Sequence, residues 1–330
     1  MRLLFLAPRH DPLTPFPELA NEQIMAGPDW PDLRWGQQVV SLSMPPGQGS
    51  VADLLSQLPP DQAPDTLVCL ADTRRLQLPK DTEAFAGPKL LLLANLDASQ
   101  APSPGLLNYL KQEQFDRVVV VDDRRAAEQL HRAGVNADWF PGLVLPTLEH
   151  QLKARPGDEH APAVAIVGDD TATLHLVTPA IRALRRGGIP VDVLARDDFE
   201  WDAGSGARLA IHLSAATHFP VSPWHLLGGG TLPVVARPPA GTGWAEVLRE
   251  GEQWFGFTDF AEMVEVVKSL RNDPARVQTC IDRNRNWFKR HLSASARRKA
   301  WQDYVATGTL PEVFSPIVAP PASAPFVLSP

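Results

Sequence analysis

The stretch 218–235, HFPVSPWHLLGGGTLPVV, places histidines beside a helix start and a glycine-rich stop. Ser222 is a good N-cap residue and Pro223 suits the first helical position, which predicts a helix of barely two turns. The glycines at 228–230 end this helix, because glycine readily adopts positive φ. The backbone N–H groups at such a start can bind an anion, with His225 one turn in and facing it. Alternatively, Ser222 caps a purely structural helix and His225 packs in the core.

A second segment with binding chemistry is the loop formed by Gly241, Thr242 and Gly243, which follows an apolar run and precedes a helix pattern. The backbone of this loop can approach phosphate or sugar oxygens closely, because glycine carries no side chain. Glu246 follows one turn into the helix and can accept hydrogen bonds from hydroxyl groups. The alternative is an ordinary helix start.

A third candidate segment begins at Gly168, where a buried run ends. Gly168 and Thr171 are candidate ligand contacts in this turn. The two aspartates between them repel phosphate but can cap a helix or bind hydroxyl groups. No Lys or Arg stands beside the turn, so positive charge for a phosphate must come from Arg196 or Arg237.

Candidate general bases lie in the first half of the chain, where polar residues follow apolar runs. His10 and Asp11 come after the run 2–7, and Asp97 comes after the run 89–94. A histidine or carboxylate at the end of a strand can take a proton from an attacking hydroxyl group, provided that it reaches that group. The alternative for each is ordinary loop polarity.

Composition and missing motifs exclude several classes of protein. The chain has 330 residues, 44% hydrophobic content and a net charge of −7, which argues against nucleic-acid binding. No apolar run reaches 18 residues, and the apolar start is too short for a signal peptide, so we expect no membrane segment. Nine histidines form no HExxH pattern and no cluster with cysteine, and neither a P-loop nor GxSxG occurs, so we expect neither metal nor cofactor. Cys69 and Cys280 lie far apart, which fits a reducing cytoplasm.

Short continuous apolar runs alternate with amphipathic stretches along most of the chain. Continuous runs are typical of strands that are buried on both faces, so we expect parallel sheets covered by helices. The predicted strands are 2–7, 37–43, 66–71, 89–94, 117–122, 137–140, 163–168, 190–195, 208–214 and 232–237. The predicted helices are 51–58, 124–134, 176–188, 244–250, 260–270, 272–293 and 296–308. On the helix 176–188, we expect Arg182, Arg185 and Arg186 to form a solvated face.

A polar segment, 150–161, interrupts this pattern and is the predicted linker. The fold class is therefore α/β, with two tandem Rossmann-like domains and a cleft between them. We expect domains at 1–150 and 151–310, and a Pro-rich tail at 311–330 that either crosses back onto the first domain or is disordered.

Four stretches, in this order, resemble a GT-B glycosyltransferase of the group 1 nucleotide-sugar and spore-maturation-type families. They are FDRVVVVDDRRAAEQLHRAGV (115–135), ADWFPGLVLP (137–146), WHLLGGGTLPVV (224–235) and AGTGWAEVLREGEQWFGFTDFAEMVEVVKSLRNDP (240–274). Together they cover about 115–310, while the region before that matches only in its pattern of elements.

The resemblance implies that the second domain binds a nucleotide-sugar donor and the first a glycan, small-molecule or protein acceptor. In such families a Glu contacts the donor ribose, and His225 stands at its position. A second Glu, eight positions upstream, is replaced by Thr217, next to His218. The Arg and Lys that grip the donor diphosphate in the family are not evident after Gly168.

Three functions follow from these observations. The first is a glycosyltransferase that moves a sugar from a nucleotide-sugar donor to an acceptor. The second is a non-catalytic GT-B protein that acts as a binding subunit of a glycosylation complex, which the missing Glu pair favours. The third is a two-domain protein that closes on a small molecule.

Overall fold

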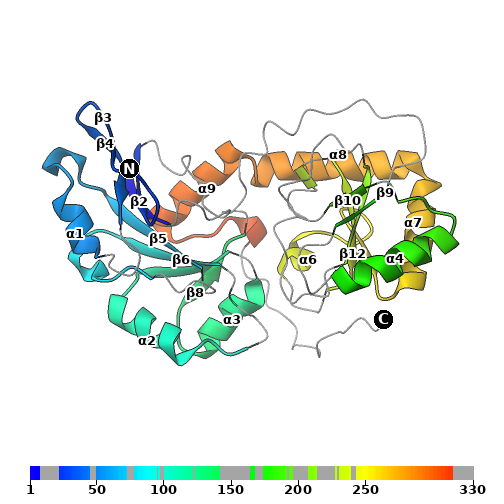
Figure 1. Cartoon of the computed structure of the whole chain (residues 1–330), viewed down its shortest axis with the longest axis horizontal. Helices are drawn as coiled ribbons and strands as arrows, with labels where there is room; N and C mark the ends of the chain where they lie inside the picture. Colours follow the sequence, from blue (N-terminus) through cyan, green and yellow to red (C-terminus); the bar gives the residue numbers. More distant parts are fainter. Residues whose placement is uncertain are drawn as a thin grey trace. The chain divides into compact units, whose positions relative to one another are not determined.

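The chain folds into two compact units (Figure 1). Unit 1 comprises Met1–Pro146 and Arg297–Ser315, and unit 2 comprises Thr147–Ala296 and Pro316–Pro330. The computed structural model describes residues 1–7, 22–44, 50–72, 78–94, 96, 100–121, 123–141, 164–167, 174–191, 193–195, 207–213, 227–228, 230–238 and 243–314.

Unit 1 is built on an eight-stranded sheet in the order β3-β4-β2-β1-β5-β6-β7-β8. Neighbouring strands are parallel, except that β3 pairs with β4 in the antiparallel sense. The strands are β1 (Arg2–Leu6), β2 (Glu22–Gly27), β3 (Leu33–Trp35), β4 (Gln38–Ser43), β5 (Thr66–Asp72), β6 (Lys89–Ala94), β7 (Arg117–Val120) and β8 (Ala137–Trp139). The order reverses between β1 and β5, as in a Rossmann-like fold.

The central strands of unit 1 are apolar along their length because both faces of the sheet are covered. Leu4 and Phe5 of β1 and Leu91 and Leu93 of β6 are all 0% exposed. The helices are α1 (Val51–Ser56), α2 (Pro104–Glu113) and α3 (Arg124–Arg132), with 3-10 helices η1 (Pro60–Gln62) and η2 (Thr82–Ala84). Side chains cap all three α-helices at their first turns, namely Ser50, Ser103 and Asp123.

Residues 297–314, the C-terminal part of the described chain, also belong to unit 1. They comprise most of α9 (Ala294–Thr307) and the 3-10 helix η4 (Glu312–Phe314). Trp301 and Tyr304 are 0% exposed, and their ring centroids lie 6.1 and 5.8 Å from that of Phe140. The ring centroid of Phe314 lies 5.7 Å from that of Phe140. We call these four residues the return cluster.

A partly buried hydrogen bond completes the return cluster. The Tyr304 hydroxyl donates to Asp138 Oδ2 at 2.6 Å, and the Arg117 guanidinium lies 5.2 Å from the Tyr304 ring centroid. Burial, followed by the bond to Asp138, raises the pKa of Tyr304 far above its ordinary value, so the phenol remains a donor. Helix α9 is thus fixed to the end of β8 by apolar and polar contacts together.

The return cluster changes the predicted domain boundary. The sequence pattern assigns residues up to 310 to the second domain, whereas the structure groups Arg297–Ser315 with unit 1. The reason is that the partners of α9, Asp138 and Phe140, lie more than 150 residues away in the sequence. The helix pattern shows which face is apolar, but not which core receives it.

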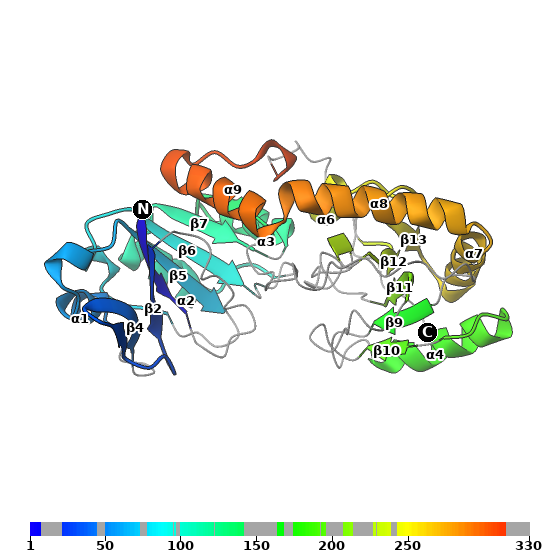
Figure 2. The same ribbon diagram turned by 90° about the horizontal axis from the view of Figure 1, so that it is seen from above.

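Unit 2 contains a five-stranded parallel sheet in the order β10-β9-β11-β12-β13. The strands are β9 (Val164–Val167), β10 (Val193–Ala195), β11 (Leu209–His212), β12 (Leu232–Ala236) and β13 (Phe255–Phe257). The helices are α4 (Leu174–Arg186), α6 (Gly243–Val247), α7 (Phe260–Arg271) and α8 (Pro274–His291). Helices α4 and α8 lie on opposite sides of the strands in both views (Figures 1 and 2). The core is aliphatic, with Val164, Leu209, Val234 and Leu184 all 0% exposed.

The predicted strands are all present, but three further strands were not predicted. These are β2, β3 and β13. Strand β2 (EQIMAG) ends in Ala and Gly, which have low strand propensity, and β13 is only three residues, FGF. Each is held by pairing with a neighbouring strand rather than by its own composition.

Candidate active site

Each sheet has one point at which its strand order reverses. Strand order reverses between β1 and β5 in unit 1, and between β9 and β11 in unit 2. In open α/β sheets, ligands bind outside the carboxyl ends of the strands at such points. His10 and Asp11 come directly after β1 in the sequence. Gly168 and Thr171 come after β9, and Ser222 comes after β11.

Most of the predicted site residues lie outside the described residues, so their roles remain predictions. They are His10, Asp11, Asp97, Gly168, Thr171, Arg196, His218, Ser222, His225, Gly241 and Thr242.

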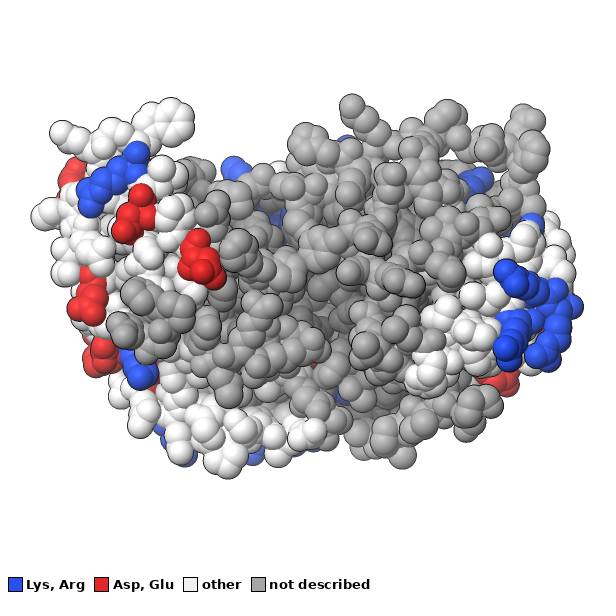
Figure 3. All heavy atoms as spheres, in the orientation of Figure 1, with Lys and Arg blue, Asp and Glu red and all other residues white. Residues whose placement is uncertain are grey.

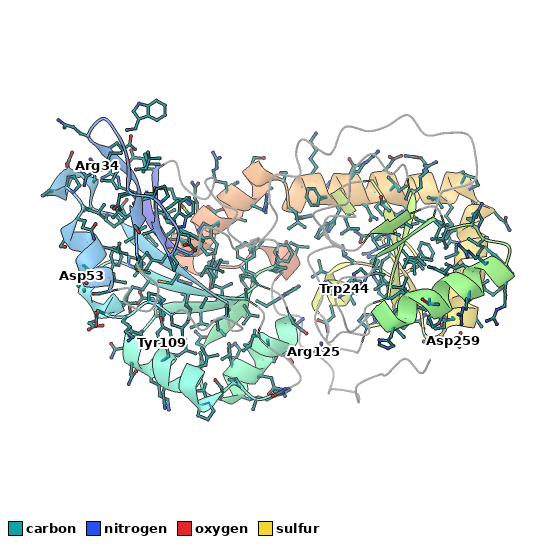
Figure 4. The ribbon with its side chains drawn as sticks, in the orientation of Figure 1. Arg34, Asp53, Tyr109, Arg125, Trp244 and Asp259 are labelled. Atoms are coloured by element: carbon teal, nitrogen blue, oxygen red, sulfur yellow. The ribbon has the colours of Figure 1, made fainter. Side chains whose placement is uncertain are left out.

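Gly243 and Glu246 are described, and both lie on the short helix α6 beyond the carboxyl end of β12. Trp244, between them, is only 3% exposed (Figure 4), and its ring centroid lies 4.8 Å from that of Trp254 in an edge-on contact. The Trp254 indole N–H donates to the carbonyl of Leu248 at 3.0 Å, and this bond holds the residue that directly follows α6. This tryptophan pair fixes a five-residue helix that is too short to be stable alone. Glu246 remains partly exposed in the first turn, as a ligand contact requires.

An ion-pair network lies at the exit of β12, next to the start of the Gly241 segment. The Arg237 guanidinium donates to Glu250 Oε1 at 2.9 and 3.3 Å and to Glu262 Oε1 at 3.3 Å. The hydroxyl and the backbone N–H of Thr258 both donate to Glu262 Oε2 at 2.6 Å. The Arg237 N–H donates to the carbonyl of Phe257 on β13 at 2.7 Å. We call Arg237, Glu250, Thr258 and Glu262 the Arg237 network.

The protonation of this network follows from its contacts. The Thr258 hydroxyl, with its backbone N–H and Arg237, lowers the pKa of Glu262 below its ordinary value. Glu250 is the main group that raises the pKa of Arg237. Both carboxylates accept hydrogen bonds from the Arg237 guanidinium. Arg237 therefore does not offer the free positive charge that the sequence suggested. Its role in the structure is to fix the point where the chain leaves β12.

Gly228 and Gly230 lie in the glycine-rich stretch that ends the predicted helix, and their surroundings explain why glycine stands there. Gly230 has a φ of +80°, which confirms the predicted use of positive φ. A Cβ atom at Gly230 would also collide with the guanidinium of Arg285. At Gly228, a Cβ atom would lie 3.0 Å from the ring of Phe288. Helix α8 therefore packs directly on this glycine segment, a contact that no local motif shows.

The sequence analysis did not predict a contact that lies at the end of β1. The Trp30 indole N–H donates to the carbonyl of Ala7, the last described residue before His10, at 2.8 Å. Gly27, with a φ of +147°, lies against the same carbonyl, where a Cβ atom would collide. The segment that carries the candidate base thus starts from a fixed point. Trp30 stands in a Pro-rich stretch without periodicity, so only the three-dimensional structure identifies it.

Positively charged side chains gather on the surface of unit 2 near the end of α4. Figure 3 shows Lys and Arg side chains gathered at the edge where α4 ends. Arg182, Arg185 and Arg186 of α4 are exposed, which confirms the predicted solvated face. Cations in the last turn of a helix interact favourably with its dipole.

In the described part of the chain, no helix combines the length and apolar character that a bilayer crossing requires. Within the same residues, no three His, Cys, Asp or Glu side chains gather into a group that could hold a metal ion.

Comparison with known proteins connects this geometry to a fold. No protein-family model matches the chain, and no curated protein matches its sequence. HepE of Anabaena, solved in complex with UDP-glucose, superposes with a TM-score of 0.61 at 11% identity, over 93% of this chain and all of HepE. A glycosyltransferase from Rickettsia africae gives 0.62 at 8% identity, over 93% of this chain and 99% of its own. This chain has the GT-B fold.

A third solved structure extends the GT-B likeness. Sucrose-phosphate synthase from Thermosynechococcus elongatus matches with a TM-score of 0.55 at 14% identity, over 92% of this chain and 99% of that protein. Each match spans both units, which confirms the predicted class of two tandem Rossmann-like domains. Unit 1 and unit 2 are the two domains of this GT-B fold.

Proposed function

We propose that this chain is a glycosyltransferase that moves a sugar from a nucleotide-sugar donor to a glycan, small-molecule or protein acceptor. The observation that carries the proposal is the match to HepE, which spans 93% of this chain and whose structure contains UDP-glucose. The strand reversals in both sheets support it, because they are the points at which open α/β folds bind ligands.

Unit 2 is the donor-binding domain in this proposal. Backbone N–H groups at Gly168 and at the start of the helix predicted at Ser222 hold the donor diphosphate. His225 contacts the ribose at the position where related families carry Glu. Thr171 and His218 complete the contacts to the nucleotide from the segments after β9 and β11.

The loop after β12 binds the transferred sugar and its phosphate. Gly241, Thr242 and Gly243 approach through their backbone, and Glu246 accepts a hydrogen bond from a sugar hydroxyl. Arg196 supplies positive charge to the departing diphosphate, since Arg237 is already occupied by two carboxylates. One preorganised donor of this kind lowers a barrier by about 3 kcal/mol.

Unit 1 holds the acceptor, and His10, Asp11 or Asp97 is its general base. The base takes the proton of the acceptor hydroxyl while the acceptor oxygen bonds to the anomeric carbon of the sugar. The bond from that carbon to the diphosphate breaks, and the nucleoside diphosphate leaves with its electron pair. In this proposal N–H groups and arginine stabilise that charge, so neither a metal nor a further cofactor is needed. The free, buried thiols of Cys69 and Cys280 support a reducing compartment, the cytoplasm.

Thermal unfolding of the full chain with UDP-, GDP-, ADP- and dTDP-sugars tests donor binding. A donor at a hundred times its dissociation constant should stabilise the fold by about 2.7 kcal/mol. His225→Ala should weaken this binding without unfolding the protein. His131→Ala is the matched control, because His131 is exposed on α3 of unit 1, outside the proposed donor segments. The absence of a shift with all four sugars would contradict the proposal.

A second candidate function is a non-catalytic binding subunit of a glycosylation complex. The observation that favours it is the replacement of both family glutamates, by Thr217 and His225. Release of free nucleotide from the stabilising sugar, with acceptor present and EDTA added, separates the two. Release supports the enzyme without a metal, whereas stabilisation without any release supports the binding subunit.

A further inference from the structure

The outer strand of the unit 1 sheet carries the most exposed apolar surface of the described residues. Trp35 is 84% exposed and Leu33 is 50% exposed, and both belong to β3. Since side chains alternate along a strand, these two project from one face and Arg34 from the other. An edge strand also presents unpaired backbone N–H and C=O groups to another strand. Figure 4 shows Arg34 on this hairpin at the end of unit 1.

The strand is held in place before any partner binds. The Ser41 hydroxyl donates to the carbonyl of Pro31 at 2.6 Å, and the Ser43 N–H donates to Asp32 Oδ1 at 2.7 Å. Gly36 turns the hairpin with a φ of +62°. Among the described residues, no carboxylate forms an ion pair with Arg34, although Asp32 stands only two positions away. The hairpin therefore presents a preformed edge with both an apolar and a charged face.

We propose that β3 pairs antiparallel with β3 of a second copy of this chain, centred on Leu33. In that register Leu33 faces its own counterpart, and Trp35 faces Pro31 of the second copy. On the opposite face, Arg34 meets the Asp32 carboxylate of the second copy, and the symmetry repeats this ion pair. Two copies of the segment PDLRW are thus complementary when they run antiparallel.

Charge selects this register over its neighbour. Centring the pair on Arg34 would place two guanidinium groups directly opposite each other, which destabilises a sheet. Centring it on Leu33 pairs every charge with its opposite and every apolar side chain with another. The contact is short, because β3 itself has three residues, so the dimer should be reversible rather than permanent.

Sedimentation velocity of the full chain over a series of concentrations tests the pairing. The wild type should shift from monomer to dimer as concentration rises. Arg34→Asp and Asp32→Arg should each remain monomeric, because each change turns both ion pairs into like-charge contacts. An equimolar mixture of the two variants should associate again, because both ion pairs are restored between unlike chains. Arg132→Asp, which changes a residue 64% exposed on α3, should dimerise as the wild type does.

Three results would overturn the proposal. A wild type that is monomeric at every concentration excludes the pairing. A dimer that both single variants retain must use another surface. A monomeric protein in which Trp35→Ala weakens acceptor binding assigns this face to the acceptor instead. Circular dichroism confirms that each variant is folded, and Leu33→Lys, which places two cations face to face, replaces any variant that is not.

Discussion

The return cluster of unit 1 and the Arg237 network of unit 2 both fix the chain just beyond the carboxyl end of a strand, but by different physical means. The return cluster is buried, with Trp301 and Tyr304 at 0% exposure. The Arg237 network is open to water, with side-chain exposures of 39% for Arg237, 42% for Glu250 and 35% for Glu262. Burial of aromatic surface stabilises strongly, whereas exposed ion pairs contribute about 0–1 kcal/mol.

The return cluster thus mainly stabilises its unit, whereas the Arg237 network mainly positions the chain. The stability of unit 1 depends on a segment that is distant in the sequence, because α9 and η4 fill the space beyond β8. In unit 2, charged side chains hold the exit of β12 in one geometry at little gain in stability. An exposed polar network of this kind can therefore be altered without unfolding the domain.

Trp301→Ala should produce the largest loss of stability. Removing a fully buried indole from the return cluster should lower the free energy of unfolding by about 3–5 kcal/mol. Trp35→Ala is the matched control, because Trp35 is 84% exposed, and it should change stability by no more than about 0.5 kcal/mol. Guanidinium unfolding at low protein concentration measures both. Equal effects of the two variants would show that the return cluster does not hold unit 1 together.

Tyr304→Phe should have an intermediate effect, because it removes only the hydroxyl that donates to the Asp138 carboxylate. Loss of a hydrogen bond to a charged group should lower stability by about 1.5–3 kcal/mol. Tyr109→Phe removes a hydroxyl that donates to the backbone carbonyl of Pro79 at 2.8 Å, and should lower it by only about 0.5–1.5 kcal/mol. The same unfolding measurement compares them. A larger loss in Tyr109→Phe would contradict the assigned importance of Asp138.

The smallest effect should come from Glu262→Gln and should depend on pH. Hydrogen bonds from Thr258 and the charge of Arg237 hold the pKa of Glu262 below its ordinary value. The carboxylate therefore stabilises unit 2 at pH values above about 4.3, and this contribution is lost as pH falls through the lower pKa of the folded state. Glu262→Gln should flatten the loss of stability on acidification, measured by thermal unfolding at successive pH values. Glu265→Gln, at a residue 73% exposed on the same helix, should retain the wild-type acid profile.

The framework of both sheets could be predicted because local composition determines it. Runs such as KLLLLA and RVVV are typical of strands buried on both faces, and β6 and β7 lie where those runs stand. Strand β2 could not be predicted in the same way, because EQIMAG lacks a strand composition and depends on pairing with β1. The attachment of α9 to unit 1 depends on Asp138 and Phe140, which no periodicity within 296–308 can indicate.

Of the candidate site, the sequence predicted the start of a helix that carries Gly243 and Glu246, and α6 begins there. The pairing of Trp244 with Trp254 was not foreseen, because two tryptophans ten residues apart carry no motif. Arg237 was expected to offer free charge, but its carboxylate partners stand 13 and 25 positions further along the chain.

Hydrogen exchange of the full chain, with and without the nucleotide sugar that stabilises it most, tests whether unit 2 binds the donor. The donor should slow exchange in unit 2, in the segments 164–176, 209–230 and 236–247, while the β1–β2 region of unit 1 exchanges as before. Protection confined to unit 1, with those three segments unchanged, would contradict the assignment of unit 2 as the donor-binding domain.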